Sequence, residues 1–331
     1  MSDYADETTR IMAGDHPAIA RALNLIEDRR PSAGPAIEAV LTALAQRCPP
    51  LAGHRVGLTG PPGVGKSTLV AAVAREIRSR QGRVGVIAVD PSSVRSGGAL
   101  LGDRARMGFD PQDHALFVRS LSTGGDAGGL SYAVPAAVEV LAGAFDNVLV
   151  ETTGVGQTET DVEHVVDTVC LVIQPGSGDV LQFIKAGIME IPDVLVVNKS
   201  DHGVLARRAA SDLVGALDSL RGVGVGRSDG WQVPVCLTSA RDRQGIAELV
   251  DALAAHRKYL AQDGLEGRRM AGAVAWACDL FRRAHGDFGV AWFGGRKGLA
   301  DLVARRLATG LSAPAVARAL SADYLAALKQ A

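Results

Sequence analysis

The pattern GxxxxGKS/T is matched in full by Gly60-Pro61-Pro62-Gly63-Val64-Gly65-Lys66-Ser67. A short apolar run at Arg55–Thr59 predicts a strand before this stretch, and the apolar spacing over Thr68–Arg80 predicts a helix after it. A glycine-rich turn between a strand and a helix is the context in which this pattern forms a phosphate-binding loop, or P-loop. Its glycines let backbone N–H groups surround phosphate oxygens, and the helix N-terminus adds partial positive charge. The stretch therefore predicts a P-loop nucleotide-binding domain.

Outward from the P-loop, apolar runs alternate with segments of helical spacing. Further strands are predicted at Arg83–Val89, Phe145–Val150, Val169–Ile173, Val194–Val197 and Val233–Leu237, and a last helix at Gly245–Leu260. Near-continuous β-branched strands separated by helices are typical of a parallel sheet covered on both faces. We predict an α/β fold with a doubly wound, mostly parallel sheet of the P-loop NTPase class.

Helical patterns flank this sheet region on both sides. Residues 10–47 have apolar residues at helical spacing, and residues 268–329 do so around a glycine-rich stretch. We therefore predict an N-terminal helical extension at 1–50, a P-loop domain at 51–261 and a C-terminal helical arm at 262–331.

The apolar face of the predicted arm has two interpretations. Trp276, Leu280 and Phe281 are spaced for one side of a helix. Such a face forms an interface with a second copy or packs back on its own domain, and the two look identical in sequence. We predict a homodimer with the arm as its interface.

Composition narrows the functional classes. Hydrophobic residues make up 47% and charged residues 21% of the 331, and the formal net charge is −1. These values are typical of a globular protein and indicate neither nucleic acid nor membrane as a partner. The N-terminus is polar and acidic, without the apolar segment of a secretory signal, and no apolar run reaches the roughly 20 residues of a membrane span. We predict a cytoplasmic protein.

The base specificity is predicted from Asn198-Lys199-Ser200-Asp201, an NKxD pattern directly after a predicted strand. In this pattern the aspartate accepts hydrogen bonds from guanine N1–H and the 2-amino group, and adenine offers neither donor. After the next strand, Thr238-Ser239-Ala240 is where guanine-binding proteins place a backbone N–H for guanine O6. The sequence therefore predicts GTP and GDP as ligands. The predicted nucleotide-binding residues are Gly60, Pro61, Pro62, Gly63, Val64, Gly65, Lys66, Ser67, Thr68, Asn198, Lys199, Asp201, Ser239, Ala240 and Arg241.

Catalysis and magnesium binding are assigned to the same end of the sheet. Lys66 is placed to reach the β- and γ-phosphates, and the Ser67 hydroxyl to ligate Mg²⁺. A strand ending in Glu151, with Gly154 three positions later, is where P-loop enzymes place an acid that holds magnesium and a glycine N–H that senses the γ-phosphate. Lys66, Glu151 and Gly154 are therefore predicted to be catalytic.

Two further acids are candidate magnesium ligands. Asp90 ends another predicted strand, and Asp103 lies in the loop that follows it. Asp103 has a second interpretation, as the cap of a turn. The predicted metal set is Ser67, Asp90, Asp103 and Glu151.

Val155, the residue after the predicted sensor Gly154, predicts slow GTP hydrolysis. Many small G proteins have a glutamine there that orients the attacking water, whereas this chain has Val155. Gln157 lies two positions further on and is the alternative water-orienting residue. We expect unaided hydrolysis to be slow.

Five stretches together closely resemble the MeaB/ArgK-type GTPases, relatives of the metallochaperone GTPases. They are GPPGVGKST from residue 60, VDPSS from 89, SGGALLGDRARM from 96, ETTGVGQTE from 151 and VNKSD from 197. The resemblance covers residues 10–260 or so and implies a SIMIBI-type P-loop fold. It departs from the family's usual pattern at Arg104, where lysine is common, and over residues 119–129.

The resemblance implies a GTP-dependent chaperone for an adenosylcobalamin-dependent acyl-CoA mutase. Such proteins gate cofactor delivery to methylmalonyl-CoA mutase or a relative and protect or reactivate it. It also implies that Asp90, Asp103 and Glu151 surround magnesium. Gly176–Lys185 resembles an additional switch loop, in which Lys185 would speed hydrolysis when the partner binds. Without the resemblance, Lys185 is a solvent-exposed helix lysine. Which mutase is the client stays open, and isobutyryl- and hydroxyisobutyryl-CoA mutases are alternatives.

Three other functions are alternatives. A nickel-insertion GTPase needs clustered soft or imidazole ligands, but the seven histidines are dispersed and the four cysteines form no CxxC pair. A P-loop kinase or transport-linked NTPase would more often use ATP, against which the NKxD pattern argues. A scaffold that binds nucleotide without turnover is disfavoured by intact Lys66, Ser67 and Glu151.

Overall fold

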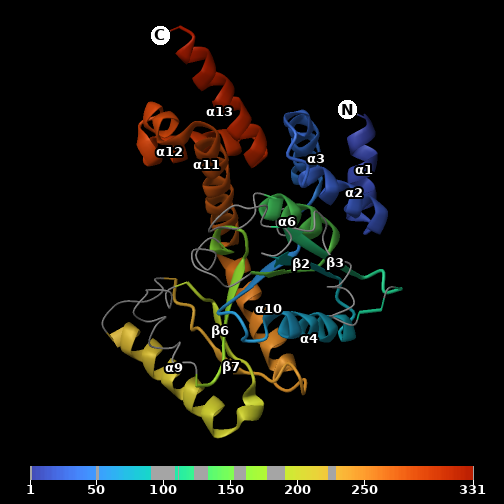
Figure 1. Ribbon diagram of the computed structural model, residues 1–331, viewed down its shortest axis with the longest axis vertical. Helices are drawn as coiled ribbons and strands as arrows, with labels where there is room; N and C mark the ends of the chain where they lie inside the picture. Colours follow the sequence, from blue (N-terminus) through green and yellow to red (C-terminus); the bar gives the residue numbers. More distant parts are fainter. Residues whose placement is uncertain are drawn as a thin grey trace.

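The computed structural model describes residues 2–49, 52–90, 109–110, 112–122, 133–152, 162–176, 191–222 and 229–330. Its centre is a seven-stranded sheet with the strand order β3-β2-β4-β1-β5-β6-β7, and every pairing between neighbours is parallel (Figure 1). The strands are β1 (His54–Thr59), β2 (Val84–Asp90), β3 (Leu116–Ser122), β4 (Asn147–Glu151), β5 (Thr168–Ile173), β6 (Val194–Val197) and β7 (Val235–Leu237). The predicted doubly wound α/β fold is confirmed.

Helices cover both faces of this sheet. On one face β4 packs Val148 and Val150 against α6 (Ala133–Ala144), and on the other it packs Leu149 against α4 (Lys66–Ser79). All three side chains are fully buried, which explains why the strands are apolar at every position. Helix α10 (Ile246–Gln262) lies beside α4, and α9 (Val204–Gly222) covers β5 and β6 on the face of α6.

Strand β3 and helices α6 and α9 were not predicted from the sequence. The run Leu116–Ser122 is interrupted by Arg119 and Ser120, which weakens its strand pattern. Strand β3 stands at the edge of the sheet, and Arg119 Nη2 donates to Asn24 Oδ1 at 2.7 Å. A strand with one neighbour needs no continuous apolar run.

The N-terminal helices pack onto the face of the sheet that α6 covers (Figure 1). They are α1 (Ser2–Met12), α2 (His16–Ile26) and α3 (Gly34–Arg47). Asp15 begins α2, because its side chain accepts a hydrogen bond from Ala18 N at 3.0 Å. Ile19, Leu23 and Leu44 are buried in one continuous cluster with α6. The extension therefore shares its core with the P-loop domain.

The C-terminal residues form three helices that extend away from the sheet (Figure 1). They are α11 (Leu265–Trp292), α12 (Gly295–Leu307) and α13 (Ala313–Leu328). Gly286 has φ 63° and interrupts α11, a conformation that favours glycine. The arm has its own core, in which Phe281 is fully buried against Val303, Leu320 and neighbouring side chains.

Within one chain, Phe281 therefore packs on the arm itself, and Trp276 and Leu280 are partly buried. This is the second interpretation left open for that apolar face. The large exposed hydrophobic side chains of α11 include Phe288, 88% exposed, and Trp292, 50% exposed. Among the described residues, no helix is long and apolar enough to cross a membrane.

Two consecutive arginines join the arm to the sheet. Arg268 binds both carboxylate oxygens of Asp193, at 3.1 and 2.9 Å, and Arg269 binds both oxygens of Asp167, at 2.8 and 2.7 Å. Asp193 directly precedes β6 and Asp167 directly precedes β5. Both carboxylates are almost completely buried. The arm is thus attached to the amino-terminal edge of the sheet by two bidentate ion pairs.

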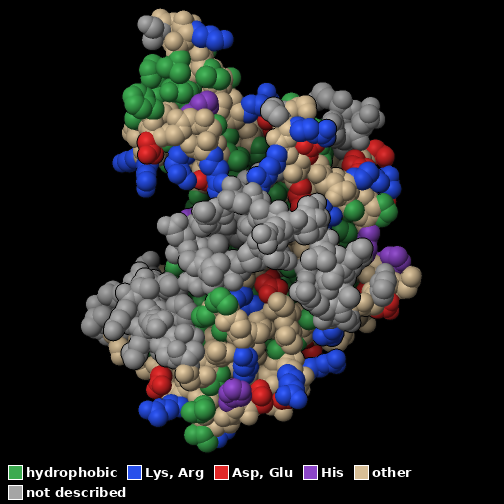
Figure 2. Space-filling view, in the orientation of Figure 1, with side chains coloured by type: hydrophobic (Ala, Val, Ile, Leu, Met, Phe, Trp, Pro, Cys, Tyr) green, Lys and Arg blue, Asp and Glu red, His purple; other side chains and the backbone are tan. Residues whose placement is uncertain are grey.

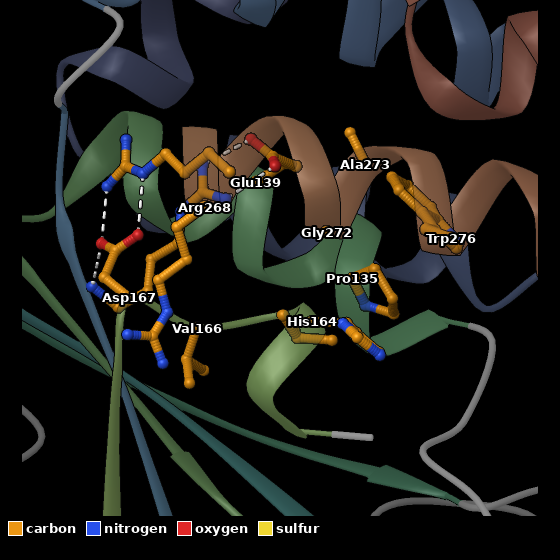
Figure 3. Close-up of a pocket in the computed structure, with 12 residues that line it drawn as sticks. Pro135, Glu139, His164, Val166, Asp167, Arg268, Gly272, Ala273 and Trp276 are labelled. Atoms are coloured by element: carbon orange, nitrogen blue, oxygen red, sulfur yellow. Dashed lines mark hydrogen bonds and ion pairs between the residues drawn. The ribbon is translucent and has the colours of Figure 1, made fainter. Parts of the chain in front are cut away.

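The approach of α11 to the sheet also depends on a glycine. A Cβ at Gly272 would lie 2.2 Å from His164 O, in the short helix η3 (Val162–His164). Gly272 and Trp276 line a small cavity together with Glu139 of α6 and Asp167 (Figure 3). A larger side chain at position 272 would force α11 away from η3 and from Asp167.

We expect Asp193→Ala to destabilise the protein strongly. The change leaves Arg268 without its carboxylate partner, and breaking a buried pair in this way costs about 3–5 kcal/mol. Asp279→Ala is the matched control, because Asp279 pairs with Arg282 and Arg283 on the arm's surface, where loss of a pair costs less than about 1 kcal/mol. Urea denaturation measures the free energy of unfolding of both variants. An equal decrease of this free energy in the two variants would contradict the structural role of the Arg268–Asp193 pair.

Candidate functional site

The predicted nucleotide residues gather at the carboxyl edge of the sheet. β1 runs into the P-loop and lies between β4 and β5, while β6 and β7 end in the Asn198–Asp201 and Ser239–Arg241 segments. In open α/β sheets ligands bind outside the carboxyl ends of the strands. Parallel pairing therefore brings together segments separated by more than a hundred positions in the chain.

Three glycines give the P-loop its shape. Gly60, Gly63 and Gly65 have φ values of 144°, 80° and 92°, in the region where residues with a Cβ are strained. A Cβ at Gly60 would lie 2.0 Å from Val172 O, and one at Gly65 would lie 2.8 Å from Asn198 Nδ2. At Gly63 there is open space within 4 Å. The loop thus needs glycine for close packing at two positions and for backbone conformation at all three.

Lys66 folds back over its own loop. Its Nζ donates to Gly60 O at 2.7 Å and Pro61 O at 2.9 Å, and the side chain is buried. Gly65 caps α4 in the left-handed conformation, so Lys66 and Ser67 form the first turn of the helix. In general, the first N–H groups of an α-helix have no carbonyl partner within the helix. The geometry places a cation and a helix N-terminus at one point, which suits a phosphate.

Ser67 and Glu151 face each other across the end of the sheet. Ser67 Oγ donates to Glu151 Oε1 at 2.5 Å, and Glu151 is 9% exposed at the end of β4. A hydroxyl and a carboxylate are hard oxygen donors of the kind that magnesium takes. These two residues therefore fit a magnesium ion beside the P-loop.

Two threonines that sequence analysis did not single out join β1 and β4 here. Thr152 N donates to Leu58 O at 3.1 Å, and Thr152 Oγ1 donates to Thr59 Oγ1 at 3.0 Å. Both threonines are buried. They fix the end of β4, and so Glu151, relative to the start of the P-loop. The sequence signal that could have indicated these two threonines is their place, since each lies at the end of an apolar strand segment.

Asn198 connects three segments of the site. Its Nδ2 donates to Val64 O in the P-loop at 2.8 Å. Its Oδ1 accepts from Ala240 N and from Thr238 Oγ1, both at 3.2 Å. The side chain is 2% exposed. Asn198 thus joins its own loop to the P-loop and also holds the segment after β7.

Lys199 and Asp201 extend these connections toward solvent. Lys199 Nζ donates to Gly63 O at 2.8 Å and to Gln174 Oε1 at 2.5 Å. Ser239 Oγ donates to Asp201 Oδ1 at 3.2 Å. Asp201 and Arg241 are exposed, whereas Ser239 and Ala240 are buried. An exposed carboxylate beside the segment after β7 is the arrangement that the NKxD prediction requires for a purine base.

Part of the predicted set lies outside the described residues: Asp103, Gly154, Val155, Gln157 and Lys185. Asp90 ends β2, and nothing is described of its side chain. Among the described residues, no three His, Cys, Asp or Glu side chains form a group that could hold a metal ion.

Comparison with known proteins assigns the family. The family model described as methylmalonyl Co-A mutase-associated GTPase MeaB matches residues 19–284. The chain belongs to this family of GTPases.

Relatives of known name are similar over most of their length. A putative GTPase of Pyrococcus abyssi is 43% identical over 259 residues, which are 77% of this chain and 76% of that protein. The mitochondrial methylmalonic aciduria type A homolog of Mus musculus is 36% identical over 83% of this chain and 68% of its own. A solved structure of a LAO/AO transport system kinase matches 97% of both chains, with 27% identity and a TM-score of 0.65. This MeaB-family chain therefore binds GTP and GDP.

Replacing Asn198 by alanine should weaken GTP and GDP binding equally. The change removes three hydrogen bonds that position the P-loop and the segment after β7, each worth about 0.5–1.5 kcal/mol, so we expect at least about tenfold weaker binding of both nucleotides. Titration with fluorescent nucleotide analogues measures the affinities.

Ser219→Ala is the control, since Ser219 Oγ donates to Gly215 O on the exposed surface of α9. If Asn198→Ala is folded and binds both nucleotides like the control, Asn198 does not organise the site.

Proposed function

We propose that this GTPase is a chaperone for an adenosylcobalamin-dependent acyl-CoA mutase and that its nucleotide state gates cofactor delivery. The observation that carries the nucleotide part is Asn198, which joins the P-loop to the segment after β7. The description of the family as mutase-associated supports the partner class. Methylmalonyl-CoA mutase is the first candidate client.

We assign guanine to the opening between the Asn198–Asp201 segment and residues 239–241. Asp201 would accept from guanine N1–H and the 2-amino group, and the backbone N–H of this second segment would donate to O6. Lys199, held by Gly63 O and Gln174, would lie along the base. This assignment explains a preference for GTP over ATP, because adenine cannot donate to the Asp201 carboxylate.

The phosphates would occupy the P-loop. Lys66 would exchange its bonds to Gly60 O and Pro61 O for β- and γ-phosphate oxygens, so binding replaces hydrogen bonds that already hold the ammonium in place. The backbone N–H groups of Gly63 to Thr68 would surround the phosphate oxygens. These groups stabilise the charge that develops as the γ-phosphoryl group passes to water.

Ser67 and Glu151 would hold magnesium, with Asp90 and Asp103 as further ligands. Bound magnesium neutralises charge on the β- and γ-phosphate oxygens. The Ser67 hydroxyl now donates to Glu151 and would turn its oxygen toward the ion. Gly154 is proposed as the γ-phosphate sensor and Lys185 as the residue through which the mutase speeds hydrolysis.

The central test is phosphate release from GTP and ATP, alone and with purified cobalamin-dependent acyl-CoA mutases. We expect slow release from GTP, little from ATP, and stimulation by one mutase. Lys66→Ala should lower GTP turnover by at least about 100-fold, the scale of losing one preorganised charge-stabilising group. Lys297→Ala, at an exposed position of α12, is the control.

Other outcomes point to other functions. GTP turnover that no mutase changes would leave a GTPase and remove the chaperone proposal. Transfer of labelled phosphate to an acceptor instead of water would favour the kinase alternative, which the description of one similar structure as a transport system kinase brings into consideration.

We also propose that residues 262–331 form the arm of a homodimer. Phe288 and Trp292 are exposed on its outer part, and Figure 2 shows hydrophobic side chains gathered there.

Phe288→Asp should convert the dimer to a monomer in size-exclusion chromatography with light scattering, because a charge would be buried in the interface. Leu205→Asp, at a residue 55% exposed on α9, is the control. A Phe288→Asp dimer, or a monomeric wild type, would contradict this interface.

A further inference from the structure

A second pocket lies at the amino-terminal edge of the sheet, on the side away from the P-loop. It is bounded by the ends of α4 and α10 and by the first residues of β1 and β4. Its volume is about 460 Å³, within the range of small-molecule binding pockets. The lining residues are His54, Val56, Ile77, Arg80, Gly82, Asn147, Val250, Leu253, Ala254, Arg257, Lys258 and Ala261.

The walls of this pocket are mostly apolar. Val56, Val250 and Leu253 are almost completely buried and belong to the core cluster of this face of the sheet. Ala254 and Ala261 are exposed, so small side chains leave the entrance open along α10. A pocket with an aliphatic base and an open side suits a hydrocarbon group that is partly withdrawn from water.

The charged side chains that line the pocket are all basic. Its lining contains Arg80, Arg257 and Lys258 and no acidic residue. Glu76 and Asp251 pair with Arg80. Arg257 Nη1 donates to the backbone oxygen of Asp146 at 3.3 Å.

The other titratable group of the lining adds no charge. Burial lowers the pKa of His54 to about 3, and the nearby Asp167 offsets this only in part. The imidazole is therefore neutral at physiological pH, and its Nε2 lies 2.7 Å from Thr168 Oγ1. The positive charge of the pocket comes from its arginine and lysine side chains alone.

The carboxyl ends of α4 and α10 also face this region, and their partial negative charge opposes an anion. A helix end contributes about 0.3–1 kcal/mol at an exposed site. Two full cations within the same pocket, Arg257 and Lys258, outweigh that effect at contact distance.

We propose that this pocket binds a small amphiphilic anion, an aliphatic carboxylate whose chain packs against Val56, Ile77 and Leu253 and whose carboxylate binds Arg257 and Lys258. The site is separate from the nucleotide site, because its lining shares no residue with the P-loop or the guanine-binding segments. The proposal goes beyond the proposed function and does not depend on it.

Octanoate is the probe, and its binding to the full chain is measured by isothermal titration calorimetry with and without GDP. We expect saturable binding with a Kd below about 1 mM, unaffected by GDP. Octylammonium should not bind, because it would meet the same cations. Octanol should bind at least about tenfold more weakly than octanoate, since it lacks the charge.

Ala254→Trp fills the pocket and should weaken octanoate binding at least about tenfold. Ala255→Trp is the matched control, since Ala255 is the next residue of α10, is also exposed, and does not line the pocket. Lys258→Glu should weaken binding similarly, and Lys297→Glu on α12 should leave it unchanged. Octanoate binding that is absent, or equal in Ala254→Trp and Ala255→Trp, or matched by octylammonium, overturns the proposal.

Discussion

The nucleotide site depends on one buried amide, that of Asn198. Its two ends bind Val64 O on one side and Ala240 N and Thr238 Oγ1 on the other. Lys199 Nζ also joins the two loops, by donating to Gly63 O at 2.8 Å, but Asn198 binds the P-loop and the segment after β7 at the same time. An amide suits this position because it offers a donor and an acceptor in one small group. A carboxylate would face Val64 O with a second acceptor, and an aliphatic side chain would leave buried polar groups unsatisfied.

The carboxyl edge of the sheet is arranged to bind a ligand, whereas the amino edge stabilises the attachment of the C-terminal arm. At the carboxyl edge, glycines and helix starts supply N–H groups for an anion, and the polar residues are partly open to solvent. At the amino edge, Asp167 and Asp193 are closed off and paired with Arg269 and Arg268. Burial would raise the pKa of Asp167, but the hydrogen bonds and charge of Arg269, together with Arg55, hold it below its usual value. This pair therefore stabilises the fold above the pKa of an unfolded aspartate, about 3.9, and the contribution is lost as the pH falls through the lower folded value.

Sequence alone predicted the features that are continuous in the chain. The P-loop and the Asn198–Asp201 segment are continuous motifs, and six of the seven strands were predicted because their apolar runs are complete. Fewer residues were predicted correctly where the role of a side chain depends on partners that are distant in the sequence. Arg268 and Arg269 look like ordinary helix arginines until the fold brings them to Asp193 and Asp167, far away in the chain. Strand β3 was missed because Arg119 and Ser120 interrupt its apolar run. Phe281 and Phe288 are both aromatic residues of one helix, and only the packing of α12 and α13 distinguishes the buried one from the exposed one.

Strand β6 joins the two edges of the sheet directly. It has four residues, all fully buried, with Asp193 directly before it and Asn198 directly after it. The arm is therefore attached, through Arg268 and Asp193, to the strand that positions the guanine-binding loop. A close-packed strand of this length, paired on both sides with β5 and β7, cannot stretch or slide to absorb a displacement at one end. A displacement of α11 at Arg268 would therefore act on Asp193, which β6 alone separates from Asn198.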